Sequence, residues 1–459
     1  MAFLTFLDKQ HSIAKPGYSR WLVPPAALSI HLCIGQIYAY SVFNEPMTRI
    51  LGISSSVDGD WALTTLGWIF SIALFMLGAS AALFGKWLER VGPRKAMFTS
   101  AFCFGSGFLV AALGVYVHNI WIVYLGHGVL GGIGLGLGYI SPVSTLIKWF
   151  PDRPGLATGM AIMGFGGGAM IASPLSVRLM KYFSTANSVG VAETFIAMGI
   201  IYFIVMMYGV FTVRIPQDSW KPDGFEPSTI KSNSMITTAQ VDADTAVQTP
   251  QFWLIFAVLM LNVTAGIGVL GQASVMIQEM FSIDVVGQDK AVTAAAAAGF
   301  VGLLSLFNMI GRFFWSSTSD KIGRKNTYMI FFLLGAILYV AIPSFGNMGN
   351  TTLFIATFCI IISMYGGGFA TVPAYLKDMF GVMQVGAIHG RLLVAWSLAA
   401  LFGPSLINYL RAYQIETVGL PPAQAYSFTM YIMAGLLIIG FACNALVKPV
   451  DPKYHHNRE

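Results

Sequence analysis

The chain has 459 residues, of which 56% are hydrophobic and only 10% are charged. A soluble domain carries about 25% charged residues, so a water-soluble globular protein is excluded and lipid must surround most of the surface. The formal net charge of +6 does not indicate a nucleic-acid partner, because membrane proteins collect Lys and Arg in their cytoplasmic loops.

Twelve apolar runs reach the ~20 residues that a membrane-spanning helix needs. In chain order they cover residues 21–43, 61–85, 96–117, 119–147, 157–177, 194–213, 252–277, 291–318, 327–346, 351–376, 392–410 and 425–447. The first run begins only at Trp21, whereas the apolar region of a cleavable signal lies close to the start of the chain. We therefore expect this run to remain in the protein as the first span.

A polar segment rich in Pro, Ser, Thr and Asp separates the sixth run from the seventh, and we expect it to be a solvated linker. The predicted organisation is an N-terminal segment at 1–20, a six-helix bundle at 21–214, the linker at 215–250, a second six-helix bundle at 251–447 and a tail at 448–459.

The distribution of Lys and Arg predicts the orientation. If both chain ends are cytoplasmic, the inner segments hold 20 of the 26 Lys and Arg residues, and the outer loops hold only Arg49, Arg178, Lys181, Lys290 and Arg411. Basic residues favour the cytoplasmic side. The pattern predicts a multi-pass protein of the cell membrane with cytoplasmic N and C termini.

The two halves of the chain resemble each other. "GKWLERVGPRK" follows the second run and "SSTSDKIGRK" follows the eighth, so that Glu89 matches Asp320 in position. Pro174 and Pro404 match at nearly the same spacing. Two matches at one spacing indicate an internal duplication, and paired halves with a site between them are typical of transporters.

The loop after the second run resembles the signature loop of the major facilitator superfamily, through Gly85, Glu89, Arg90, Gly92, Arg94 and Lys95. "WFPDRPGLATG", "TPQFW", "SLFNMIGRFFWSSTSDKIGR" and "YGGGFATVPAYLKDMFG" together resemble the oxalate:formate antiporter family within it. The resemblance implies an all-α polytopic membrane protein with twelve transmembrane helices in two six-helix bundles. It also implies exchange of small carboxylates by alternating access.

The same loop and its second copy are the predicted inward gate. We expect Glu89, Arg90 and Arg94 to form ion pairs that break when the bundles separate. Asp320 and Arg324 are the corresponding candidates in the second copy.

One arginine lies inside an apolar run. Arg312 is seven residues before Ser319, where the membrane boundary is expected, which places it about 10 Å below the surface at ~1.5 Å per residue. A charge at that depth costs at least ~2.5 kcal/mol. Every Asp and Glu falls in a predicted loop or at a helix end, so no carboxylate of the protein is expected beside it. An anionic substrate explains the residue, because a guanidinium grips one carboxylate through two parallel hydrogen bonds.

The family resemblance implies further substrate-binding residues. They are Tyr38 and, nearby, Gln36 in the first run, Tyr139 in the fourth, Phe165 in the fifth, and Tyr365 and Phe369 in the tenth. Any one of these side chains alone would also suit ordinary core packing.

Trp396 departs from the family pattern. Oxalate exchangers of the family carry a lysine at this position, where it receives the second carboxylate, and here the residue is uncharged. Arg391 lies nearer the cytoplasm and is expected to be an interface anchor. One central cation fits a monoanion better than a dianion, so formate-, lactate- or pyruvate-like monocarboxylates are favoured.

His31 is a candidate proton site, because histidine titrates near neutral pH. Anion exchange and proton-coupled symport both stay open. Oxalate/formate exchange is the alternative within transport, and a transporter-like anion sensor is the alternative of another class. No enzyme activity, cofactor or metal is expected, the four cysteines are taken as core residues, and a monomer is expected.

Overall fold

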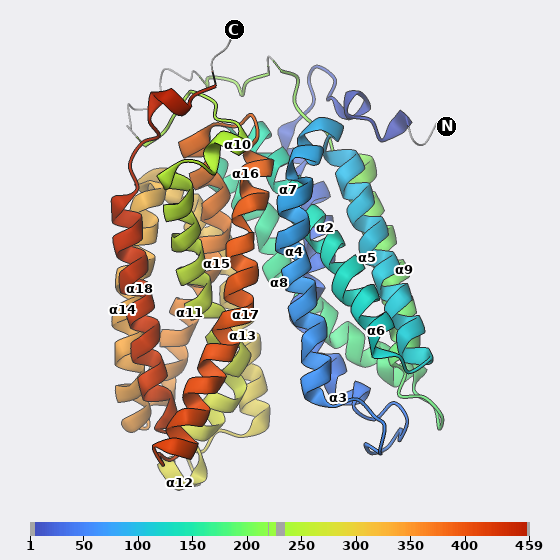
Figure 1. Ribbon diagram of the computed structural model, residues 1–459, viewed down its shortest axis with the longest axis vertical. Helices are drawn as coiled ribbons and strands as arrows, with labels where there is room; N and C mark the ends of the chain where they lie inside the picture. The colour runs from blue at the N-terminus through green and yellow to red at the C-terminus, as the bar shows by residue number, and fades with distance from the viewer. Residues whose placement is uncertain (1–4, 219, 226–234, 457–459) are drawn as a thin grey trace.

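The structure is a computed structural model, which describes residues 5–218, 220–225 and 235–456. The chain is helical almost throughout (Figure 1). The first half contains α2 (Pro24–Ile34), η3 (Gly35–Phe43), α3 (Asn44–Met47), α4 (Leu63–Val91), α5 (Pro93–Tyr116), α6 (Ile120–Val123), η4 (Tyr124–Leu130), α7 (Gly131–Trp149), α8 (Pro154–Phe183) and α9 (Val191–Thr212).

The second half repeats this pattern. It contains α11 (Pro250–Met280), α12 (Ile283–Val286), α13 (Ala294–Ile322), α14 (Arg324–Asn347), α15 (Thr351–Phe380), α16 (Val385–Leu392), α17 (Val394–Ala412), η6 (Tyr413–Thr417) and α18 (Ala425–Leu446). Short helices outside the halves are η1 (Lys9–Ser12), η2 (Arg20–Leu22), α10 (Ala243–Ala246) and η7 (Pro452–Tyr454).

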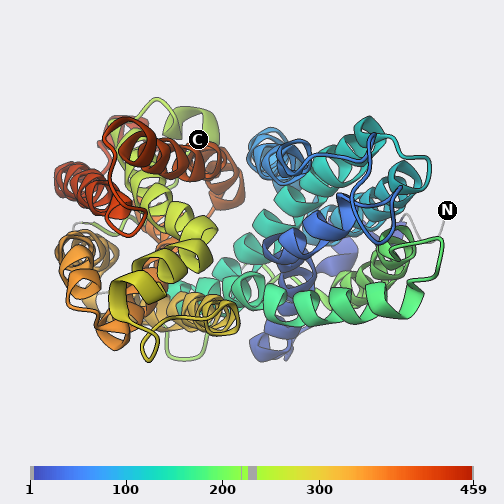
Figure 2. The ribbon, with the colours of Figure 1, turned by 90° about the horizontal axis from the view of Figure 1, so that it is seen from below.

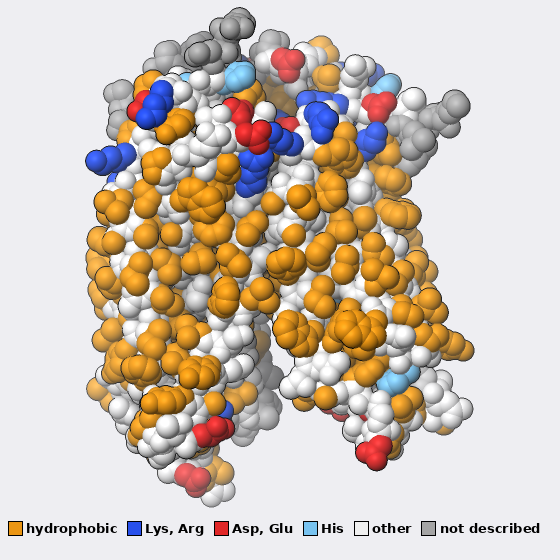
Figure 3. All heavy atoms as spheres, in the orientation of Figure 1, with side chains coloured by type: hydrophobic (Ala, Val, Ile, Leu, Met, Phe, Trp, Pro, Cys, Tyr) orange, Lys and Arg blue, Asp and Glu red, His pale blue; other side chains and the backbone are white. Residues whose placement is uncertain are grey.

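The predicted fold class is confirmed. Within the described residues, 11 helical segments are long and apolar enough to cross a membrane. The remaining predicted span is α13, which has 29 residues and packs between α8 and α15. Apolar side chains form a broad belt around the molecule, and the charged side chains visible in Figure 3 lie at its two ends. This is the surface of a multi-pass membrane protein.

Several predicted helix boundaries are wrong. The first span is not one regular helix, because its α-helical part ends at Ile34 and tighter turns follow from Gly35. A Cβ atom at Gly35 would lie 2.4 Å from the backbone oxygen of Phe165, so only glycine allows this approach to α8. The eleventh span begins at Val385, because nearly all of α16, including His389, is buried against other helices and does not form a loop.

The two halves lie side by side (Figure 2), and they meet at one end and part at the other (Figure 1). The first and the last described segments of the chain lie at the end where the halves meet, which we call the N/C face. There α4 packs on α16, and α8 packs on α13. Glycines permit this contact, since a Cβ atom at Gly85 would lie 2.7 Å from the Cα atom of Ala387.

Toward the opposite face the halves enclose a cavity of about 360 Å³. Its lining comes from both halves, with Tyr38, Phe70 and Gly166 on one side and Leu270, Ser305 and Asn308 on the other. The space-filling view shows the molecule notched between the halves at this end (Figure 3). The structure is therefore closed at the N/C face and hollowed from the opposite one.

The linker is more ordered than predicted over the part that the structure describes. Its backbone bonds to the end of α15, with the amide of Val241 donating to the oxygen of Phe380 at 2.9 Å. It then forms α10, in which Asp244 contacts Lys86 of the first half and Arg391 of the second. Residues 219 and 226–234 of the predicted linker lie outside the described residues.

Candidate functional site

Arg312 is fully buried in α13, between α8 and α15. Its Nε donates to the Oδ1 of Asn308, one turn earlier, at 3.1 Å. Both terminal guanidinium nitrogens are buried without a hydrogen-bond partner among the described residues. No ion pair within the described chain includes Arg312, so the side chain presents two unused donors and an uncompensated charge.

Aromatic rings enclose the guanidinium. Its carbon lies 5.6 Å from the ring centre of Phe165 and 5.2 Å from that of Phe369. Such contacts with aromatic faces stabilise a cation. Room for the side chain comes from Gly166 on α8, where a Cβ atom would lie 2.9 Å from the Nε of Arg312.

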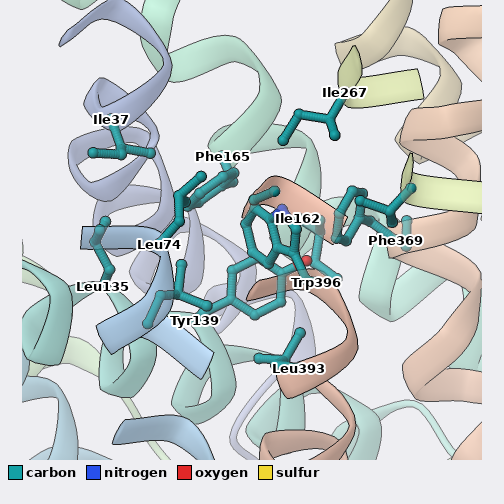
Figure 4. Packing of buried hydrophobic residues seen from close by; sticks show 14 of the residues in the cluster. Ile37, Leu74, Leu135, Tyr139, Ile162, Phe165, Ile267, Phe369, Leu393 and Trp396 are labelled. Atoms are coloured by element: carbon teal, nitrogen blue, oxygen red, sulfur yellow. The ribbon is translucent and has the colours of Figure 1, made fainter. Parts of the chain in front are cut away.

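Trp396 and Tyr139 complete the enclosure, which we call the central cage: Arg312, Phe165, Phe369, Tyr139 and Trp396. The Trp396 ring centre lies 4.5 Å from that of Phe369 and 5.4 Å from those of Phe165 and Tyr139. Figure 4 shows these rings converging from separate helices. The Trp396 Nε1 and the Tyr139 hydroxyl are also buried without a partner in the described chain.

Two tyrosines lie beside the cage, and one of them, Tyr38, also lines the cavity. The hydroxyl oxygens of Tyr38 and Tyr365 lie 3.4 Å apart, which joins the two halves of the molecule. Tyr38 is in edge contact with Phe165 and lines the cavity, whereas Tyr365 is buried against Phe369. These predicted residues thus lie together, around Arg312.

Gln36 lies elsewhere. It precedes Tyr38 by two positions, which turns its side chain to another side of the helix. The side chain is fully buried, and its amide has no hydrogen-bond partner in the described chain. The residues that line the cavity include Tyr38 but not Gln36.

Two histidines flank Tyr139, and only one of them was predicted. The Nε2 of His31 donates to the backbone oxygen of Tyr139 at 3.2 Å, and the two rings stack with centres 5.3 Å apart. His389 of α16 lies 5.8 Å from the same ring, and both of its nitrogens lack a partner among the described residues. Sequence reasoning missed His389 because it started the eleventh span at residue 392. It missed Asn308 because an asparagine in an apolar run carries no charge to flag it.

Two carboxylates join the halves at the N/C face by a repeated contact. Asp320 of α13 accepts from the backbone amides of Gly155 and Leu156, both at 2.8 Å, at the start of α8 in the other half. Glu89 of α4 accepts from the amide of Gly386 at 3.1 Å, near the start of α16. A carboxylate at a helix N-terminus is favourable, because unpaired amides point at it.

Basic side chains hold both carboxylates in place. Lys148 bonds to Glu89 at 2.7 Å. Arg324 pairs with Asp320 at 2.6 Å and with Asp378 at 3.0 Å. Glu89, Asp320 and Arg324 therefore belong to the contact that closes the N/C face.

The other two predicted gate residues do not form the expected ion pairs. Arg94 donates to the backbone oxygens of Phe6, His11 and Val213 and stacks on the Phe6 ring, so it fastens the N-terminal segment to its own half. Arg90 is exposed, and no ion pair of the described residues includes it. The predicted pairing was wrong for Arg94 because its partners are backbone oxygens, which no sequence motif displays.

Comparison with known proteins shows which family has this architecture. A family model described as Major Facilitator Superfamily matches residues 26–404 and, in a second match, residues 280–459. Among solved structures, the Escherichia coli fucose:proton symporter FucP aligns with a TM-score of 0.66 at 12% identity, over 94% of this chain and 100% of that one. A likeness at this identity concerns the fold alone.

Three curated relatives align over most of their length. The uncharacterized MFS-type transporter YhjX of Escherichia coli (strain K12) is 24% identical, over 83% of this chain and 86% of its own. The oxalate:formate antiporter of Oxalobacter formigenes is 25% identical, over 84% of each chain. The apicoplast pyruvate carrier 1 of Toxoplasma gondii is 21% identical, over 93% of this chain and 88% of its own.

Proposed function

The chain belongs to the Major Facilitator Superfamily, and from this premise we propose that it is a secondary transporter of small monocarboxylate anions. It carries formate-, lactate- or pyruvate-like anions across the cell membrane by alternating access, with the N/C face in the cytoplasm. The observation that carries the proposal is Arg312, a buried cation with two unused donors at the meeting point of both halves.

The chemistry of the cage fits one carboxylate. The two free guanidinium nitrogens lie in the parallel arrangement that a carboxylate accepts. An arginine left unpaired in such a place costs several kcal/mol, and an arriving anion removes that cost. The unpaired Tyr139 hydroxyl and Trp396 Nε1 are donors for the remaining lone pairs. Aromatic walls exclude water, which strengthens each of these contacts.

The single positive charge of the central cage favours a monoanion. Trp396 stands in the cage without a charge, and Arg391 is engaged by α10, where it contacts Asp244 and the oxygen of Ala243. Two relatives point to the same substrate class, since one is an oxalate:formate antiporter and another a pyruvate carrier. Oxalate/formate exchange is the second candidate, and the first of these relatives favours it.

Alternating access assigns roles to both ends of the molecule. In the present conformation the substrate enters through the cavity that Tyr38 and Asn308 line, and it reaches Arg312 past the Tyr38–Tyr365 contact. The Glu89 and Asp320 contacts then release, and the N/C face opens. Exchange for a second anion, or symport with a proton, returns the carrier to the present conformation.

Purified protein in liposomes tests the proposal directly. We expect saturable uptake of labelled formate, lactate or pyruvate, and we expect unlabelled monocarboxylates inside the vesicles to accelerate it if the carrier is an exchanger. An imposed proton gradient without internal anion separates symport from exchange. Specific binding of these anions without uptake in either arrangement would instead support a sensor. Uptake of oxalate above all monocarboxylates would support the second candidate.

A further prediction concerns the gate. Glu89→Gln removes the charge that faces the start of α16 and pairs with Lys148. Because the closed N/C face loses a contact worth about 1–2 kcal/mol, we expect exchange to slow several-fold while the substrate Kd stays within about twofold. Counterflow in liposomes and equilibrium binding in detergent measure the two quantities. Glu416→Gln, at an exposed acid outside the N/C face, is the control. Equal losses of binding and exchange would contradict a gating role.

A further inference from the structure

His389 is a buried side chain that the proposed monoanion site leaves without a use. It is 1% exposed, and neither ring nitrogen has a hydrogen-bond partner among the described residues. A neutral imidazole has one donor and one acceptor, and leaving both unpaired in a protein interior costs free energy. A ligand or a proton that reaches this ring would remove that cost.

The position of His389 relates it to the cage. Its ring packs against Tyr139, whose other ring neighbours include Trp396 and Phe165. His31 borders the same rings, with its ring centre 5.3 Å from that of Tyr139 and 6.4 Å from that of Phe165. Two groups able to carry positive charge therefore border the same group of rings, with His389 against Tyr139 and Arg312 against Phe165 and Phe369.

The charged neighbours of His389 are already taken. The elements packed against α16 are α4, α7, α10, α15 and α17. The charged groups near α16 are paired with one another: Glu89 with Lys148, Asp244 with Lys86 and Arg391, and Asp378 with Arg324 and Lys377. The other titratable groups near it are Tyr139 and, on α2, His31. Within the described residues no carboxylate pairs with His389, so a negative group at this ring has to come from a ligand.

We propose that protonated His389 is the second pole of the central site and receives the second carboxylate of a short dicarboxylate. The inference rests on the proposed function, because it takes Arg312 as the pole for the first carboxylate. The proton goes onto the free ring nitrogen, and the imidazolium then donates to the arriving carboxylate. A second negative charge favours that protonated form. The site thus holds a monoanion with a neutral His389, and a dianion together with one proton.

Competition in liposomes tests the proposal. Uptake of labelled formate is measured against oxalate, malonate and succinate at about pH 7.5 and about pH 5.5, on either side of the ordinary histidine range. We expect at least one dicarboxylate to compete about tenfold better at the lower pH, relative to unlabelled formate. In His389→Gln this gain should vanish while formate uptake persists. In His389→Lys a fixed charge should give strong dicarboxylate competition at both pH values.

The matched control is His127→Gln. His127 is also a buried histidine whose nitrogens lack partners in the described chain, but it stacks on Tyr40 and packs against Phe108, away from the cage. His127→Gln should keep the pH gain of the unsubstituted protein. The competitors themselves are protonated to the same extent in assays of both variants, so a difference between the variants reports on the protein. If His389→Gln inserts poorly, dicarboxylate binding to His389→Lys in detergent, followed by tryptophan fluorescence at both pH values, gives the same decision.

The outcomes separate this inference from the function beneath it. A full pH gain in His389→Gln, or no dicarboxylate gain in His389→Lys, would overturn the second pole and leave the monocarboxylate carrier intact. Absence of formate, lactate and pyruvate uptake by the unsubstituted protein would instead remove the proposed function itself.

Discussion

Arg312→Gln should reduce saturable carboxylate uptake by about two to four decades, because removing one partner of a buried charged contact costs about 3–5 kcal/mol. The glutamine keeps a polar side chain and the bond to Asn308 but supplies no charge and no paired donors. Initial uptake rates in liposomes, normalised to the amount of protein inserted, measure the effect.

Arg312→Lys separates charge from geometry. A lysine restores the positive charge but not the two parallel donors, so uptake should stay at least about tenfold below that of the unsubstituted protein. Arg178→Gln is the matched control, since Arg178 is an exposed arginine of α8. Normal uptake by a well-inserted Arg312→Gln protein would exclude Arg312 as the anchor and with it the proposed site.

Trp396→Lys should make oxalate compete about two decades better against a labelled monocarboxylate. The ring of Trp396 lies between Phe369 and Tyr139, so in the unsubstituted protein a second substrate charge faces an indole and aromatic walls. Desolvating an unpaired charge there costs several kcal/mol, which corresponds to two or more decades in affinity. A lysine at this position offers that charge a partner.

Competition of oxalate, formate and lactate on both proteins measures the change. Trp396→Phe is the control, because it keeps an aromatic wall and adds no charge. If the unsubstituted protein at neutral pH already takes oxalate as its best substrate, the monoanion preference is wrong. The second carboxylate then has a partner among the tyrosine hydroxyls or His389.

The spans were predictable because hydrophobicity alone determines which segments enter lipid. The positions at which the helices are interrupted or begin could not be predicted. Gly35 ends a regular helix through its contact with the backbone of Phe165, more than a hundred positions away, and no local pattern displays such a contact. Residues Val385–Leu392 read as a polar boundary, yet they form α16, because its small residues pack on α4.

Some residues of the candidate site could likewise be predicted from the sequence, and others could not. Arg312 could be predicted because a charge in an apolar run always needs an explanation. The rings around it could be gathered only through family resemblance, since a tyrosine in a membrane helix is ordinary. His389 is a candidate because both of its ring nitrogens lack a hydrogen-bond partner among the described residues, and Asn308 because it accepts a hydrogen bond from Arg312. Neither property can be read from the sequence.

The repeated contact at the N/C face has a consequence for how the open carrier meets its substrate. Under the proposed alternating access the halves part there, and the amides at the starts of α8 and α16 lose the carboxylates of Asp320 and Glu89. Those carboxylates stay neutralised by Arg324 and Lys148 of their own halves. The new mouth is thus lined by two uncovered positive helix ends. Opening therefore creates an electrostatic funnel for anions, and its pull on the substrate weakens as ionic strength rises.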